Sequence, residues 1–560
     1  MTYNRGGRSR CTALRLICSL GSGVAVAALP FLLHPAQAVA TAGVVAPAVA
    51  TIVPGKSAHV LPTIRGKPAH LLPAAEAYKK LTPGQLHVRA PSTRLTLDAK
   101  RLRAAKRAVA GAATTAAPAL PAGPPVSLVN QPGLQATDEG GCCTPPDTTG
   151  AIGPNHYVET VNSLVGVYDR SLAQVASLDL ALFVGVPGAT VFDPQILFDA
   201  RGGRWYYVTD VGTSALALGW SKTDDPSDLL NGWCQFISFN TDPVFHDFPK
   251  LGGDDNFVTI GTNGFVGGTF VSSFIWATVK PLSGDTSCTV PNGFLFGDPA
   301  SPLRNADGTI AFTPVPANTT DANATGYIVS AHLDSLPANK VMAWHLVRQA
   351  DGSAALLANG DMIVNSYNIS ADAPQPGVSF LISTSDTRIT QAAGRTDPDA
   401  GAQAVWAQHT VAGPGGRSVV RWYEFLPGSL IVRQQGEIQN ATAFVFNGAI
   451  SPSSTGNDAA IFYNRSSSST LPLIGAQSRT SATPIGTMDP GELLLGNSVD
   501  PLQETGFGSN CIASSCRWGD YAGATPDQVT PGVVWGTGEL SGAFNGGLGQ
   551  WLTRNYAVTT

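Results

Sequence analysis

The sequence predicts an all-β protein, a β-propeller, and two observations carry this prediction. From residue 140 onward the chain is rich in Gly, Asn, Asp and Thr, and short β-branched and aromatic runs alternate with turn signals. Long stretches with the 3.6-residue period of an amphipathic helix are absent. A phrase that joins two such runs through a turn also recurs, at spacings of about 45 to 90 residues.

Each copy of this phrase opens with a turn rich in Asp, Asn or Pro and ends in an aromatic-aliphatic run. Clear copies contain Asp147, Asp193 and Asp247, and weaker ones cover 446–463 and 518–535. We expect each copy to form the two inner strands of a four-stranded blade, which cannot bury both faces without neighbours. The prediction is about seven blades, with six or five as alternative counts and a two-sheet sandwich as the competing fold.

The chain begins with the features of a secretory signal peptide, which we assign to residues 1–38. A basic start precedes an apolar run over 16–33, and Ala36-Gln37-Ala38 supplies a small-x-small cleavage pattern. No later stretch has the ~20 apolar residues that a membrane span needs. We therefore predict a secreted, extracellular protein, with a periplasmic or cell-surface location as the alternative.

Residues 39–130 have a different composition, rich in Ala, Pro and Val, with twelve Lys or Arg against two acidic residues. We predict a largely disordered basic linker, with a propeptide or an arm for an anionic envelope as the alternatives and a short helix near 95–110. The propeller is assigned to 131–560, which holds 18 basic and 37 acidic residues and a formal net charge of −19. That charge repels nucleic acid and suits Ca²⁺, although no ligand spacing identifies a calcium site.

Six cysteines follow the cleavage site, and an even count in an exported chain favours disulfides. We predict the pairs Cys511–Cys516 and Cys234–Cys288. The adjacent Cys142 and Cys143 are left without an assigned pairing. Zinc is the minor alternative, because no CxxC spacing or neighbouring His pair is present.

The phrases resemble those of secreted bacterial propeller proteins of mostly uncharacterised function. The resemblance covers roughly residues 140–545, and it rests on the segments Pro145–Thr148, Gly153–Val158, Asp193-Pro194 with Arg204-Trp205, Asp247–Lys250 and Arg517–Tyr521. The inner-strand phrase is also similar to that of sialidase-like and arabinanase-like propellers. An intact sialidase Asp-box is missing, so the resemblance implies the fold more than an activity.

Acidic residues at the starts of the innermost strands converge on the propeller axis and form the candidate site. Asp193, Asp247 and Asp520 are the candidate catalytic groups, since glycoside hydrolysis uses paired carboxylates. The candidate ligand-binding residues are basic, aromatic or axial, namely Asp147, His156, Arg204, Tyr206, Lys250, Arg517, Trp518 and Tyr521. Each has a structural alternative: a turn cap, an inter-blade ion pair or core packing.

Two functional hypotheses of different class follow. The first is a non-catalytic propeller that binds an extracellular glycan or protein at its funnel face. The second is a carbohydrate-active enzyme, a glycoside hydrolase or less readily a polysaccharide lyase, that uses the axial aspartates. Signatures of serine hydrolases, zincins, kinases and nucleotide-dependent dehydrogenases are absent from the mature chain. The sequence leaves open whether the chain is an enzyme.

Overall fold

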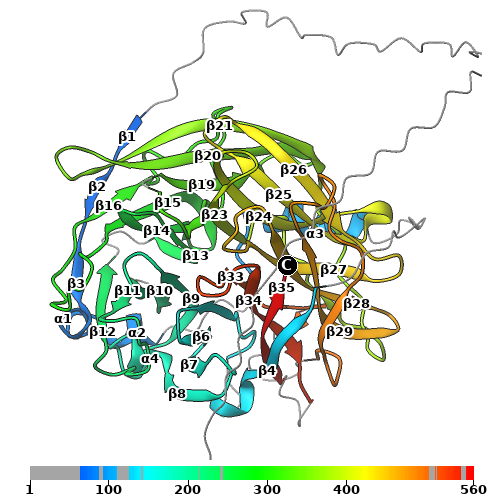
Figure 1. Ribbon diagram of the computed structural model, residues 1–560, viewed down its shortest axis with the longest axis horizontal. Helices are drawn as coiled ribbons and strands as arrows, with labels where there is room; N and C mark the ends of the chain where they lie inside the picture. The colour runs from blue at the N-terminus through cyan, green and yellow to red at the C-terminus, as the bar shows by residue number, and fades with distance from the viewer. Residues whose placement is uncertain are drawn as a thin grey trace, which may run out of the picture. The chain divides into compact units, whose positions relative to one another are not determined.

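The turn-separated runs of the sequence form short antiparallel strands that pair with their neighbours along the chain (Figure 1). The computed structural model describes 63–87, 93–109, 125–139, 143–213, 215–239, 244–323, 325–503, 511–512, 514–543 and 550–560. The predicted signal peptide lies outside the described residues. Within them, no helix is long and apolar enough to cross a membrane.

Four of the blades come from the first part of the propeller, and each is a meander whose first strand lies innermost. The first contains β5 (Thr149–Ile152), β6 (His156–Val161), β7 (Leu164–Asp169) and β8 (Gln174–Asp179). The second contains β9 (Val191–Asp199), β10 (Arg204–Val211), β11 (Ala215–Ser221) and β12 (Trp233–Phe239). The third contains β13 (Phe245–Gly253), β14 (Phe257–Val266), β15 (Thr269–Val279) and β16 (Gly293–Phe296). The fourth contains β17 (Val315–Pro316), β19 (Gly326–Ala331), β20 (Ala338–Arg348) and β21 (Ala354–Tyr367).

The remaining three blades repeat the pattern. The fifth contains β23 (Gln391–Asp397), β24 (Ala402–Ala412), β25 (Ser418–Leu426) and β26 (Ile431–Ile438). The sixth contains β27 (Phe444–Pro452), β28 (Ala459–Ser467), β29 (Thr470–Arg479) and β30 (Leu493–Asn497). The seventh contains β33 (Gly523–Pro526), β34 (Val533–Ser541), β35 (Trp551–Thr559) and β4 (Ser127–Gln135).

Five of these blades are separate sheets, whereas the third and fifth are joined into one ten-stranded sheet. The link is the two-residue strand β18 (Asn318–Thr319), which follows β17 and pairs in parallel with both β13 and β23. Dividing that sheet at β18 gives two further meanders. Seven blades result, which is the first of the predicted counts.

Apolar side chains fill the space between consecutive blades, and the last interface closes the ring. The first and seventh blades share a cluster that includes Tyr157, Tyr168 and Trp535. Tyr157 and Trp535 stack with their ring centroids 5.5 Å apart. The competing two-sheet sandwich is excluded, because a sandwich has no such seventh interface.

Within the segment 39–130, which was predicted to be a largely disordered linker, the described residues 63–87, 93–109 and 125–130 take part in this fold, and for these stretches the prediction is corrected. β1 (Thr63–Arg65), β2 (Lys67–Ala69) and β3 (Leu71–Pro73) add outer strands to the fourth, third and second blades, respectively. Helices α1 (Ala74–Tyr78), α2 (Pro83–Leu86) and α3 (Ala99–Val109) follow. The correction has a physical reason: sheet edges give short segments backbone partners that composition does not reveal.

The outermost strand of the seventh blade is β4, from the N-terminal side of the propeller, and it closes the ring. β4 pairs with β35, with Val129 opposite Ala557 and Asn130 opposite Tyr556. The propeller therefore begins before residue 131. Minor elements complete the described chain: η1 (Ala136–Glu139), α4 (Leu180–Phe183), β22 (Leu381–Ile382), η2 (Pro414–Gly416), β31 (Cys511–Ile512) and β32 (Ser515–Cys516).

Glu159, a buried residue of β6, connects β4, β35 and the first blade. Its carboxylate accepts hydrogen bonds from the Leu134 amide at 3.1 Å, the Asn555 side chain at 2.7 Å and the Tyr168 hydroxyl at 2.9 Å. The Thr553 hydroxyl is a further donor. One carboxylate thus satisfies donors from both ends of the propeller.

Replacing this carboxylate is expected to weaken ring closure. The substitution Glu159→Leu leaves at least three buried donors without an acceptor, so we expect a loss of at least about 3 kcal/mol in the free energy of unfolding. Urea denaturation measures it. Glu76→Leu is the control, since Glu76 is about half exposed in an i,i+4 pair with Lys80 and such pairs contribute little. Equal losses in the two variants would contradict the assigned role.

Both predicted disulfides are confirmed. Cys234 in β12 is bonded to Cys288 in the loop after β15, and Cys511 is bonded to Cys516. Cys143 is also disulfide-bonded, whereas Cys142 lies outside the described residues. Disulfides persist in oxidising compartments, which agrees with the predicted export.

The two bonds close loops of different length and should stabilise the chain unequally. Their sequence separations are 54 and 5 residues. Loop entropy then predicts losses of about 4 kcal/mol for Cys234→Ser with Cys288→Ser, and about 2 kcal/mol for Cys511→Ser with Cys516→Ser. Urea denaturation of the two double variants checks this order. A larger loss from the short loop would contradict the entropic explanation.

Candidate functional site

The starts of the innermost strands share an unusual backbone conformation. Positive φ angles occur at equivalent places in six blades, at Asp147, Asp193, Phe248, Thr313, Thr387 and Asn447. β-Bulges accompany it in β9, β13 and β27. A bulge redirects side chains, and here it turns polar groups of successive blades toward the propeller axis.

The structure brings together seven of the residues that the sequence selected. They are Asp147, Asp193, Asp247, Lys250, Arg517, Asp520 and Tyr521, and with Arg94, Asp210, Asp386 and Arg388 they are called the axial cluster below. Hydrogen bonds between different blades connect its members. The Asp520 amide donates to Asp147 Oδ1 at 2.5 Å, and the Tyr521 hydroxyl donates to Asp193 Oδ2 at 2.9 Å.

Asp147 and Asp520 have both carboxylate oxygens engaged. The second oxygen of Asp147 accepts from the Asn162 side chain at 2.7 Å. Asp520 is held between two guanidinium groups, because Arg517 donates to Oδ2 at 2.7 Å and Arg94 donates to Oδ1. Both carboxylates therefore act as acceptors for internal donors.

Asp193 and Asp247 differ from this pair, since burial raises the pKa of both. The pKa of Asp193 rises to about 8, by burial and then by the charges of Asp147 and Asp247. The pKa of Asp247 rises to about 6, again by burial, with Arg388 and Arg517 opposing the shift. Near neutral pH, Asp193 holds a proton and Asp247 is largely ionised.

Asp210 of β10 adds a third acid to this side of the cluster. It is 1% exposed, and neither carboxyl oxygen has a hydrogen-bond partner among the described residues. Burial raises its pKa well above the ordinary value, and the charges of Asp193 and Asp247 add to the shift. A neutral carboxylic acid is the expected form, because an unpaired buried carboxylate is costly.

Two buried basic side chains complete the cluster. Lys250 Nζ lies 3.8 Å and 3.6 Å from the ring centroids of Phe248 and Tyr521, and it donates no hydrogen bond to the described residues. Burial lowers the pKa of Lys250 well below its ordinary value. Arg388 pairs with Asp386 through two 2.7 Å hydrogen bonds, while its Nη1 has no hydrogen-bond partner in the described part of the chain.

A pocket lies among the innermost strands, with about 570 Å³ of free space, part of it open to solvent. Its walls are largely backbone and small side chains, among them Gly150, Pro316, Ala392 and Ala524. Lys250 lines this pocket as well. Its amino group thus belongs to both the axial cluster and the pocket.

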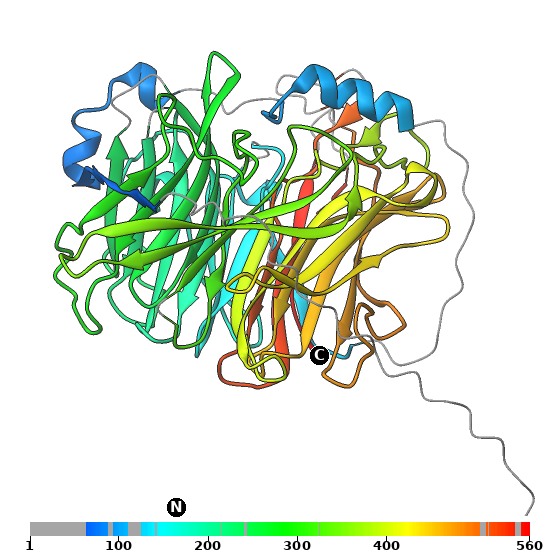
Figure 2. The same cartoon turned by 90° about the horizontal axis from the view of Figure 1, so that it is seen from above.

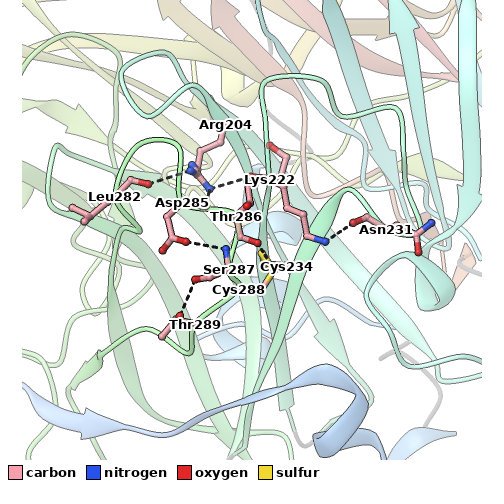
Figure 3. The surroundings of a disulfide bond; sticks show 11 residues. Arg204, Lys222, Asn231, Cys234, Leu282, Asp285, Thr286, Ser287, Cys288 and Thr289 are labelled. Carbon is pink, nitrogen blue, oxygen red and sulfur yellow. Dashed lines mark hydrogen bonds between the residues drawn. A yellow bond between two sulfur atoms is a disulfide. The ribbon is translucent and has the colours of Figure 1, made fainter.

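Four predicted site residues lie outside the axial cluster. Arg204 donates to the carbonyls of Ser221, Leu282 and Asp285, and so holds the loop that carries Cys288 (Figure 3). Tyr206 packs between the second and third blades. The Trp518 ring packs on Phe446. His156 begins β6. Arg204, Tyr206 and Trp518 are at most 1% exposed, so packing or backbone bonding explains them.

Four members of the cluster were not among the residues selected from the sequence. Asp386 and Arg388 stand before β23 much as Asp247 and Lys250 stand at the start of β13. A stricter comparison of the starts of the innermost strands would therefore have indicated both residues. Asp210 lies in the second strand of its blade, opposite Phe192. Arg94 lay in the predicted linker, and no sequence pattern indicated its contact with Asp520.

One group of side chains in the described residues has the spacing of metal ligands, and it lies outside the axial cluster. Ligand atoms of Asp307, His332 and Asp361 lie within 4.8 Å of one another. Lys340 Nζ lies 3.3 Å from Asp307 and 3.5 Å from Asp361. Calcium prefers six to eight oxygen ligands, so this group does not fit the calcium site considered from the sequence.

Comparisons with known proteins identify no sequence relatives: no family model matches, and no curated protein matches. Solved propellers are similar in structure. A sialidase of Trypanosoma rangeli is 11% identical, with a TM-score of 0.33, and the match covers 65% of this chain and 54% of the sialidase. An α-L-arabinofuranosidase from Fusarium graminearum is 10% identical, with a TM-score of 0.36 and coverages of 65% and 92%. An endo-arabinase from Bacteroides thetaiotaomicron is 12% identical, with a TM-score of 0.28 and coverages of 54% and 93%.

The raised pKa of Asp193 predicts a pH-dependent stability. The folded chain keeps this proton up to about pH 8, whereas an ordinary aspartate loses it near pH 4. The stabilising contribution is therefore complete below about pH 4 and is lost as the pH rises to 8. Asp193→Asn cannot lose a proton, so we expect it to be the more stable chain at pH 8, by on the order of 1–3 kcal/mol.

Thermal denaturation of the wild type and Asp193→Asn between pH 4 and 8 measures this difference. Asp351→Asn, in an exposed turn, is the control that should follow the wild-type profile. Parallel profiles for all three chains would contradict the assigned protonation of Asp193.

Proposed function

We propose that this chain is an extracellular β-propeller that binds a glycan or a protein at the axial cluster and does not cleave it. This proposal is supported above all by the hydrogen bonding and burial of the axial carboxylates. Asp147 and Asp520 have every oxygen committed to internal donors. The four predicted aspartates are at most 8% exposed. Groups committed in this way orient a binding surface, whereas an acid–base pair needs room for a sugar and a water.

The cluster also offers donors to an incoming ligand. Lys250 Nζ and Arg388 Nη1 are buried and lack hydrogen-bond partners among the described residues. A carboxylate, a sulfate or a backbone carbonyl would satisfy both groups. Hydrogen bonds to buried charged groups contribute about 1.5–3 kcal/mol each, which is enough to give specificity.

A glycoside hydrolase is the second candidate, and the separated pKa values of Asp193 and Asp247 favour it. One protonated and one ionised carboxyl is the arrangement that general acid and nucleophile or base require. The same arrangement also follows from burial of neighbouring acids in a binding site. Only a hydrolase releases a product from the glycan, so one assay for that product separates the two functions.

The test is calorimetric titration of the full chain and of Arg94→Ala with neutral and carboxylated oligosaccharides and with arginine-containing peptides. We expect binding to the Arg94→Ala chain, because that substitution removes a group from the cluster. Adding Lys250→Met should lower the affinity about tenfold through the loss of a hydrogen-bond donor. Lys222→Met is the control, since Lys222 bonds the Asn231 carbonyl in the loop between β11 and β12.

Release of reducing ends from the same oligosaccharides is measured alongside. We expect none. Product that disappears in Asp193→Asn and in Asp247→Asn would overturn the binding function in favour of the hydrolase. No binding by either chain, with both folded, would remove the proposal for these ligands.

A further inference from the structure

A segment of the chain itself occupies the axial cluster. Residues 93–109 contain Arg94 and helix α3, which lies across the strand ends on one face of the propeller (Figure 2). None of the eleven residues of α3 is buried. The helix is therefore held by polar and charged contacts more than by apolar burial.

The guanidinium group of Arg94 fits its surroundings as a ligand fits a subsite. Its Nε donates to Asp520, its Nη1 donates to Ser383 Oγ at 3.3 Å, and its Nη2 donates to the Trp518 carbonyl at 3.4 Å. The Arg94 side chain is only 9% exposed. Three acceptors surround one planar guanidinium group, and this arrangement favours arginine over lysine, whose ammonium group is a point charge.

The residues after Arg94 extend this recognition. Arg388 Nη2 donates to the Leu95 carbonyl at 2.6 Å. Leu95 and Leu97 pack against the apolar cluster between the fourth and fifth blades. An arginine followed by apolar residues one and three positions later is thus the pattern that this surface accepts.

Charge holds the rest of the segment. Lys106 Nζ donates to Asp372 and, at 2.9 Å, to Thr384 Oγ1, and Arg101 donates to the Asp334 carbonyl. Residues 93–109 carry six basic residues and one acidic residue, against the net charge of −19 for 131–560. About 310 Å³ of free space, part of it open to solvent, remains between the segment and the propeller, beside Leu97, Leu102 and Leu336. The fit is electrostatic and incomplete, as expected for a segment that can leave.

We propose that this face of the propeller is a receptor for basic, arginine-bearing peptide segments of a partner protein, and that residues 93–109 hold the site in the absence of a partner. The inference rests on the proposed binding function and names its partner class. A tethered segment has an effective concentration in the millimolar range. The free partner must therefore compete with it, and weakening the internal segment should open the site.

The experiment uses the full chain and a fluorescent peptide with the sequence of residues 93–109, in anisotropy titrations. The wild type should bind this peptide weakly, because its own segment occupies the site. The variant Arg94→Ala with Lys106→Ala should bind it at least tenfold more tightly. A peptide carrying Arg94→Ala should bind the opened chain at least tenfold less tightly, and adding Asp520→Asn to the opened chain should have the same effect.

The salt dependence of binding and a second variant distinguish an opened site from a misfolded chain. Binding should weaken as NaCl rises from about 50 to 500 mM, since surface charge pairs are screened. Arg94→Lys alone should open the site only in part, and all variants should keep the wild-type melting transition within a few degrees. If the opened chain binds the peptide no better than the wild type, or binds both peptides equally, the inference is wrong.

Titration of the opened chain with a carboxylated oligosaccharide separates this inference from the proposed function. Binding of the oligosaccharide without the peptide would overturn the inference and leave the proposed function standing. Binding of the peptide without the oligosaccharide would support the inference and restrict the ligand to proteins. Binding of neither would contradict both.

Discussion

Closure of the ring is the constraint on which the rest of this structure depends. No single four-stranded blade buries both of its faces, so each needs two neighbours, and the first and seventh blades become neighbours only if the two ends of the propeller meet. The pairing of β4 with β35 brings them together, and the buried carboxylate of Glu159 joins both strands to the first blade. The N-terminal strands β1, β2 and β3 then add to the outer edges of three blades.

The closed ring brings many charged and titratable side chains together at the propeller axis. Bulges and positive φ angles at the starts of the innermost strands place acids and cations of different blades in one buried volume. Some are satisfied by one another, as Asp386 is by Arg388. Others, such as Asp210 and Lys250, lack hydrogen-bond partners among the described residues. Unpaired buried polar groups cost stability, and their presence at the axis supports the proposed binding function.

The sequence predicted the propeller, its first-choice count of seven blades and two disulfides, because strand alternation, turn residues and cysteine number are local signals. It also selected Asp147, Asp193, Asp247 and Asp520, which the structure brings together. It could not show that Arg204 and Tyr206 face packed interfaces. The residue pattern of a strand is the same whether a given side chain points to the propeller axis or to a neighbouring blade. The role of 63–87 and 93–109 was missed because edge strands and charge-held helices depend on surfaces formed by distant residues.

Hydrogen exchange of the full chain tests most directly whether Arg94 and Asp520 hold residues 93–109 at the axial cluster. Exchange in α3 is compared between the wild type and Asp520→Asn by mass spectrometry, with the strands of the seven blades as the internal reference. The account predicts exchange at least tenfold faster in α3 of the variant, with the blade strands unchanged. Unchanged exchange in α3, or faster exchange throughout the blades, would contradict it.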